Sequence, residues 1–267
     1  MPRAFGALDL AGCCASKTAG IFDDELYFSL SNHGPLEENR ALTTLPARMH
    51  STHLSRLPVP GGTSFADIHV HEGVMADARL WQAVVQPHIR RAGRLDANWE
   101  RPSLYKRWQI FERTFCRKAS LQCIDISNGE GRSVPLAIML LSEGYPALDC
   151  SGERSVFLWY LAAAPSNALQ AMSFRYQRPM LILHAIIDAA IQRSFQLGYD
   201  GRVGLHASPA GKDELYRKYR DEVRMTALGD RVMLSLRRRI RGGKDGRYFW
   251  IDPLPARSLS ASLNYLR

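Results

Sequence analysis

The sequence is short of the features that mark several classes of protein. Its five cysteines are an odd number, and no two of them form a CxxC pair, which argues against both a disulfide framework and a zinc knuckle. It also lacks an apolar run of the roughly 18 to 20 residues that cross a bilayer, because His184 and Asp188 interrupt the apolar stretch 180–191. We therefore expect a cytoplasmic protein with no membrane partner.

Basic residues outnumber acidic ones, 35 to 26, which gives a formal net charge of +9. This excess favours a polyanionic partner, and nucleic acid, an anionic membrane surface and the phosphates of a nucleotide cofactor all qualify. The run RRRIRGGK at 237–244 can contact nucleic-acid phosphates, although such a run is more often a solvated turn between strands. The charge alone does not choose among these partners.

The chain divides into three parts by composition. Residues 1–62 show little periodicity and end in a Pro/Gly cluster at 58–62, which predicts an irregular N-terminal arm. Residues 63–100 form a helical lead-in, with apolar residues at helical spacing from Ala76 to Arg91 and a kink expected at Pro87. Residues 101–267 hold the most regular patterns and are predicted to form the main domain.

Helical and strand patterns alternate through the main domain in a mixed order. The expected elements are a helix at Ser103–Lys118, strands at Leu121–Ser127, Val134–Leu141 and Val156–Ala164, a helix at Pro179–Leu197, a strand at Arg202–Ala207, a helix at Asp213–Tyr219, and strands near Val223–Leu228 and Arg247–Ile251. Asn128-Gly129 predicts a hairpin between the first two strands. One long helix crosses between the third and fourth strands, so the pattern predicts an α+β fold with a mostly antiparallel mixed sheet.

Several local segments resemble the GNAT acyltransferase superfamily. These are the strand 157–165, the segment LGYDGRVGLHA at 197–207, Glu214-Leu215-Tyr216 and GRYFW at 246–250. The resemblance covers roughly residues 101–267. It implies a central mixed sheet with flanking helices, in which a central strand ends in a splay and a helix N-terminus receives the pyrophosphate of acyl-CoA.

The phosphate loop of that family departs from its usual pattern in this chain. In Arg/Gln-x-x-Gly-x-Gly/Ala, bare backbone N–H groups at a helix N-terminus approach the phosphates closely. The matching residues here are 175–180, RYQRPM, in which bulky side chains replace both glycines. Either the guanidiniums of Arg175 and Arg178 hold the phosphates instead, or cofactor binding has been lost; we favour retained binding. The cofactor-binding residues that the resemblance implies are Leu161, Ala162, Ala163, Arg175, Tyr176, Gln177, Arg178, Met180 and Leu181.

Two residues are candidates for proton transfer. Tyr216 matches the tyrosine that the family uses to protonate the departing thiolate, although a tyrosine at helical spacing more often packs its ring against a core. His206, at the end of a predicted strand, is a candidate base because histidine is a common proton acceptor in catalysis, but a histidine at a strand end is more often structural. The two residues that we associate with the family at Ala162 and Ser166, a Glu and a Trp, are absent.

The resemblance implies transfer of an acetyl group from acetyl-CoA to an amine of a small molecule, a protein or a tRNA, without a metal. The protein could form a homodimer. The alternative is a non-catalytic binding module with the same fold. A third hypothesis is a metal-dependent hydrolase, because DIHVHEG at 67–73 resembles the first-strand DxHxH of amidohydrolases, in which His69 and His71 would hold a metal. The rest of the chain does not read as the repeated β/α units of such a barrel, and a surface turn with two histidines is the simpler interpretation.

Overall fold

An eight-stranded mixed sheet organises the protein. The computed structural model describes residues 53–61, 64–128, 131–149, 151–229 and 247–267. The strands are β1 (Arg56–Pro58), β2 (Phe65–Gly73), β3 (Lys118–Ser127), β4 (Ser133–Pro146), β5 (Arg154–Ala163), β6 (Val203–His206), β7 (Thr226–Leu228) and β8 (Tyr248–Ile251). They lie in the order β1-β2-β3-β4-β5-β6-β8-β7.

Only one pair of neighbouring strands in this described sheet is parallel. β5 and β6 run side by side in the same direction, and the other paired strands are antiparallel. A parallel pair needs a long crossover connection, and the helix α5 (Ile182–Gln196) supplies it. This is the mixed α+β arrangement that the sequence predicted, a mostly antiparallel sheet with one long crossover helix.

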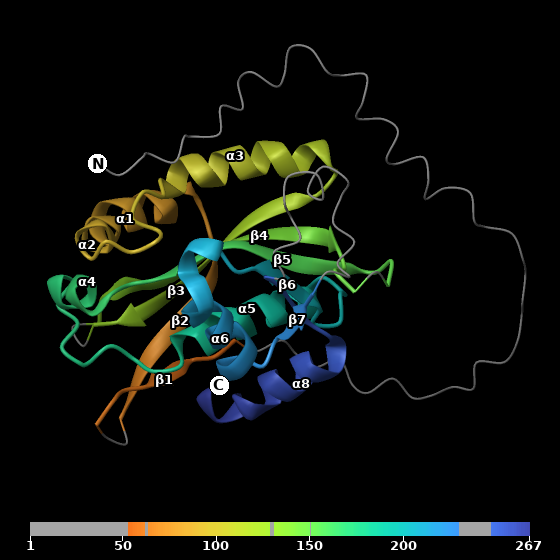
Figure 1. Ribbon diagram of the computed structural model, residues 1–267. Coiled ribbons are helices and arrows are strands. Elements are labelled where there is room, and N and C mark those ends of the chain that lie inside the picture. The colour runs from red at the N-terminus through yellow and green to blue at the C-terminus, as the bar shows by residue number, and fades with distance from the viewer. Residues whose placement is uncertain (1–52, 62–63, 129–130, 150, 230–246) are drawn as a thin grey trace, which may run out of the picture. The chain divides into compact units, whose positions relative to one another are not determined.

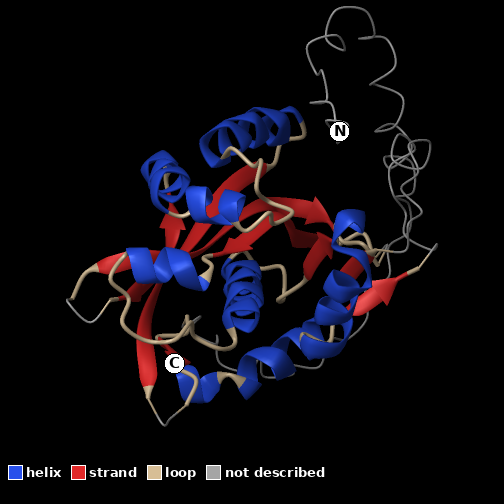
Figure 2. Cartoon of the chain, turned by 60° about the vertical axis from the view of Figure 1, so that its left-hand side comes forward, coloured by secondary structure: helices blue, strands red, loops and turns tan. Residues whose placement is uncertain are grey.

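Helices cover both faces of the sheet (Figure 1, Figure 2). The remaining helices are α1 (Met75–Val84), α2 (Gln86–Arg91), α3 (Arg101–Thr114), α4 (Ser166–Ala171), α6 (Lys212–Arg217) and α8 (Pro253–Ser262). Figure 1 shows α1, α2 and α3 on one side of the sheet, with α5 and α8 on the other. None of the described helices is long and apolar enough to cross a membrane.

The helix α5 forms much of the core beneath the sheet, and two of its buried polar residues, Asp188 and Gln192, contact the C-terminal part of the chain. Asp188 accepts a hydrogen bond from Arg267 at 2.9 Å, and Gln192 donates one to Ser260 at 2.6 Å. The helix ends before Gly198, whose φ of +78° is the left-handed conformation expected of a glycine C-cap. The interior of the predicted helix is therefore confirmed, and Asp188 and Gln192 connect it to the C-terminus and to α8.

The N-terminus of α5 differs from the prediction. The helix begins at Ile182 rather than at Pro179. The backbone N–H of Met180 donates to the carbonyl oxygen of Pro58 at 2.9 Å, and Leu181 has a left-handed φ of 60°. Because this N–H is bonded to β1 and the next residue is left-handed, the segment 179–181 leads into the helix without being part of it.

The first strands of the sheet come from segments that the sequence analysis assigned elsewhere. Leu57 on β1 is fully buried, although residues up to 62 were expected to form an arm. The segment expected as a surface turn is β2, which pairs with β3. Pro87, expected to kink one helix, lies in the first turn of a separate helix, α2. The helices α4 and α8 were not predicted, and the basic run 237–244 lies outside the described residues.

The two histidines of the DxHxH segment lie on the same side of β2. Their ring centroids are 5.4 Å apart, and Nε2 of His71 is 3.4 Å from a carboxylate oxygen of Asp125. Among the described residues, no group of three or more His, Cys, Asp or Glu side chains is arranged to hold a metal ion. The strand belongs to a mostly antiparallel sheet, which differs from the β/α barrel that the hydrolase hypothesis requires.

Candidate functional site

A cavity of about 880 Å³ opens where β5 and β6 part. Their pairing ends at Leu158 and Leu205, while β5 continues to Ala163. The wall of the cavity includes the half of β5 that no longer pairs with β6, the first residues of α5, the end of β6 and residues of the segment 208–219. The splay that the family resemblance implied is therefore present, and a ligand can enter between the two strands.

A bulge in β5 shapes one wall of this cavity. Leu140 of β4 pairs with Tyr160 and Leu141 pairs with Leu158, so the register passes over Trp159, which is the extra residue of a β-bulge. Successive side chains of a regular strand point to opposite faces, and a bulge interrupts that alternation. Both Trp159 and Tyr160 consequently contact Trp108 of α3, with ring centroids 5.0 and 5.4 Å from it.

Trp99 extends the same wall from the loop before α3. Its ring meets Tyr160 edge to face, with the centroids 4.8 Å apart. Trp99, Trp108, Trp159 and Tyr160 all line the cavity, and we call them the aromatic wall. Burial raises the pKa of the Tyr160 phenol, so it is neutral near pH 7.

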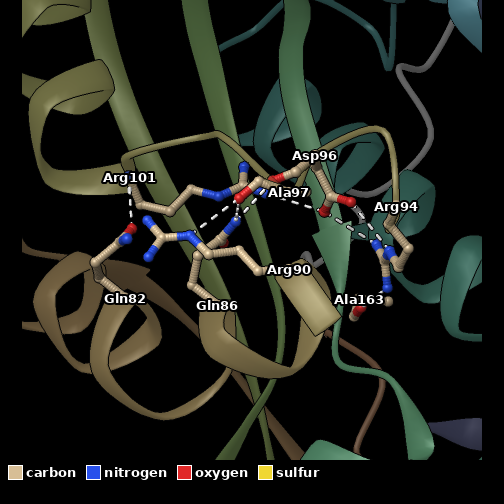
Figure 3. Close-up of polar contacts among 8 residues, drawn as sticks. All are labelled: Gln82, Gln86, Arg90, Arg94, Asp96, Ala97, Arg101 and Ala163. Carbon is tan, nitrogen blue, oxygen red and sulfur yellow. Dashed lines mark hydrogen bonds and ion pairs between the residues drawn. The ribbon is translucent and has the colours of Figure 1, made fainter. Parts of the chain in front are cut away.

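Two arginines meet at the carboxyl end of β5. Arg178 donates from Nε to the carbonyl oxygen of Ala164 at 2.9 Å, and Arg94 donates from Nη1 to that of Ala163 at 2.7 Å (Figure 3). Both line the cavity. The pKa of Arg178 is lowered, first by burial and then by the like charge of Arg94, and an anion bound between them would relieve that repulsion.

The position of Arg94 depends on a buried ion-pair network in the loop before α3. Asp96 accepts from Nε and Nη2 of Arg94, each at 3.0 Å, and from Arg101 at 3.3 Å. Gln86 donates to the backbone carbonyl of Asp96 at 2.6 Å, and Figure 3 shows these contacts converging on the loop. Burial lowers the pKa of Arg101 to about 10, with Asp96 opposing the shift.

Some of the expected cofactor-binding residues line the cavity, and others do not. Leu161, Ala162, Ala163 and Arg178 line the cavity, whereas Arg175, Tyr176, Gln177, Met180 and Leu181 lie outside its lining. The side chains of Tyr176 and Met180 are about half exposed. The expected site is therefore shifted toward β5.

The backbone of the loop is also unsuited to the glycine mode of phosphate binding. Pro179 has no N–H, and the N–H of Met180 is bonded to Pro58. The N-terminus of α5 has no side-chain cap, and Ile182 and Leu183 of its first turn line the cavity. Unbonded N–H groups of a first helical turn attract anions, so this helix end and Arg178 are the groups suited to a phosphate.

The two tyrosines near α6 occupy different environments. Tyr216 is not part of the cavity lining; its ring packs edge to face on Phe249 at 5.0 Å. Tyr219 lines the cavity and is 4% exposed, and burial raises its pKa. Lys218–Glu222 forms a π-helical turn, in which Tyr219 lies. His206, at the end of β6, also lines the cavity, with its ring 4.5 Å from that of Tyr248.

The sequence matches none of the protein-family models and none of the curated proteins that were compared with it. Two solved structures are similar at low identity. One is the KacTA–DNA complex, 11% identical, with a TM-score of 0.42, over 73% of this chain and 99% of that chain. The other is an AtaT mutant toxin bound to the C-terminus of the antitoxin AtaR and acetyl-CoA, 12% identical, with a TM-score of 0.37, over 74% and 98%. The fold assignment therefore rests on strand order and on the parallel pair.

Proposed function

We propose that the cavity between β5 and β6 binds an acyl-CoA, most simply acetyl-CoA, and that the protein transfers its acyl group to an amine. The observation that supports this most is the parting of the one parallel pair of described strands beside the N-terminus of α5. A bound thioester can lie along β5 at Leu161, Ala162 and Ala163, which pair with β4 on one side but no longer with β6 on the other, and its phosphates can reach the helix end. The strand supplies an extended edge, and the helix supplies partial positive charge.

Arg178 takes over the role of the missing glycines in this proposal. Its Nε is bonded to Ala164, which fixes the guanidinium plane at the end of β5 and leaves the two Nη groups for an anion. A guanidinium donates two parallel hydrogen bonds to a phosphate. Arg175, which we also expected to contribute, lies outside the cavity lining, so we assign it a smaller effect.

The acyl group is supplied as a thioester, whose carbonyl carbon accepts the amine nitrogen while the C–S bond breaks. The amine must lose a proton, and His206 is positioned on the cavity wall to take it, directly or through water. The departing thiolate must gain a proton. Three tyrosines line the cavity, Tyr160, Tyr219 and Tyr248, and we assign this role to Tyr219, which lies in the turn directly after α6. Burial keeps its phenol protonated near pH 7. Tyr216, the residue that the resemblance implied, lies outside the cavity lining, although both tyrosines pack against Phe249.

A non-catalytic module with the same fold is the second candidate function. The specific observation in its favour is the loop itself, because Pro179 and the bonded N–H of Met180 remove two donors that a phosphate loop would offer. In that case the cavity would bind a partner or ligand without transferring a group.

A transfer assay on two matched variants tests the proposal. Purified protein, acetyl-CoA and a panel of amines are followed by the release of free thiol. We expect turnover in the native protein, a fall of about 10²-fold or more in Tyr219→Phe, and less than about threefold change in Tyr216→Phe. Acetyl-CoA binding without thiol release on any amine would favour the non-catalytic module. Equal losses in both variants would remove the assignment of Tyr219.

A further inference from the structure

The aromatic wall is a feature of the cavity that binding of CoA does not require. Its four rings come from the loop before α3, from α3 and from the bulge of β5. All four are partly exposed, whereas the other two tryptophans, Trp81 and Trp250, are 1% exposed and belong to the core. The chain therefore presents four large rings to one side of the cavity, where their exposure to water has a cost that a bound apolar group would remove.

The charges around the cavity limit what kind of amine can use this wall. Among the described lining residues the acids are Asp96 and Glu214. Asp96 is bonded to two arginines, and Glu214 is 2.8 Å from Lys218. Each carboxylate already has a cationic partner, and Arg94, Arg178 and Lys218 also line the cavity. An acceptor with several positive charges would meet repulsion without a free carboxylate to bind.

We propose that the aromatic wall is the acceptor subsite, and that it takes a primary amine carrying one flat aromatic group. This inference rests on the proposed function. The aromatic group packs among Trp99, Trp108 and Tyr160 in the edge-to-face geometry that these rings already adopt. The amine then lies in the same cavity as His206 and Tyr219. A polyamine or a lysine-rich peptide is disfavoured, because it carries several positive charges and no aromatic group to pack on the rings of the wall.

Binding measurements with two simple amines test this subsite without requiring turnover. The full chain is titrated with phenethylamine and, separately, with spermidine, in the presence of CoA, by calorimetry and by tryptophan fluorescence. We expect phenethylamine to bind more tightly than spermidine and to change the fluorescence, because three of the five tryptophans belong to the wall.

Variants on α3 make the test specific. Trp108→Leu should weaken phenethylamine binding about two- to tenfold, the range expected for the loss of one aromatic pair, and leave CoA affinity unchanged. Phe115→Leu, at the exposed C-terminal end of the same helix and outside the cavity lining, should change neither. If Trp108→Leu does not fold, Trp99→Leu in the loop gives the same comparison.

Three outcomes would overturn the inference. Spermidine could bind more tightly than phenethylamine, or Trp108→Leu could leave the affinity for phenethylamine unchanged. The variant could also change the affinity for acetyl-CoA instead, which would show that the aromatic wall holds the acyl donor. Failure of this inference is distinct from failure of the acyl-transfer proposal. CoA binding without phenethylamine binding at millimolar concentration refutes the subsite alone, and phenethylamine binding without CoA binding refutes acyl transfer alone.

Discussion

Replacing Arg178 by alanine should weaken the binding of CoA while leaving the protein folded. In the structure its Nε is bonded to Ala164 and its guanidinium lines the cavity, so the two Nη groups are the ones that face a ligand. A hydrogen bond to a charged group contributes about 1.5 to 3 kcal/mol. We therefore expect the Kd for CoA to rise about 10- to 150-fold.

Two further variants show whether CoA binding depends on the positive charge of Arg178, on its paired donors or on its position in the cavity. Arg178→Lys keeps the charge and loses the paired donors, so it should recover part of the affinity. Arg175→Ala changes an arginine three positions away that lies outside the cavity lining, and it should alter the Kd by less than about threefold. Calorimetry measures the Kd for CoA of all three variants, after thermal unfolding has shown that each variant is folded at the assay temperature. An unchanged Kd for Arg178→Ala, or equal losses at both arginines, would refute the phosphate site.

The remaining predictions concern stability. Asp96→Asn should lower the free energy of unfolding by about 3 kcal/mol in urea titrations, because Arg101 is 5% exposed and loses its carboxylate partner; a loss under about 1 kcal/mol would mean that the network does not hold the loop. The pKa of His53 is lowered, chiefly by burial, so the unfolded state binds this proton more readily than the folded state. The free energy of unfolding should therefore fall as the pH drops below about 6.5. In His53→Gln it should fall less steeply between pH 7.5 and 5, and the same slope in both proteins would contradict this. Gly201→Ala should destabilise the protein more than Gly198→Ala. Both glycines have a positive φ, which alone costs an alanine about 1 kcal/mol. Only at Gly201 would the added Cβ meet a neighbouring side chain, at 2.7 Å. Equal losses at the two glycines, measured by thermal unfolding, would show that this close packing does not matter.

The order of the strands after residue 101, and of α3, α5 and α6 among them, could be predicted because each of these elements carries its own local pattern. The strand β5 is a continuous apolar run that stops at Pro165, and α5 combines helical periodicity with Gly198 at its C-terminal end. These signals depend on residues that are close in sequence. The strand β2 also carries a local signal, because Ala66, Ile68 and Val70 alternate with polar residues, but we interpreted its histidines as a surface turn or a metal motif.

The site was less predictable, because its residues meet through contacts between distant segments. Arg94 contacts the end of β5 across 69 positions, and no local pattern indicates that partner. The start of α5 depends on a hydrogen bond from Met180 to Pro58, which comes from a segment expected to lie outside the domain. Tyr219, which lies within a π-helical turn, lines the cavity and Tyr216 does not. Such a turn changes the side-chain direction that a regular helix would give.

Titration of the native protein with acetyl-CoA in a calorimeter tests the central claim most directly. The cavity at the parting of β5 and β6, with Arg178 and the N-terminus of α5 at its edge, predicts one binding site per chain and a Kd well below millimolar. The same titration on Arg178→Ala should show weaker binding. No heat of binding at millimolar acetyl-CoA, from protein that unfolds cooperatively, would contradict the account.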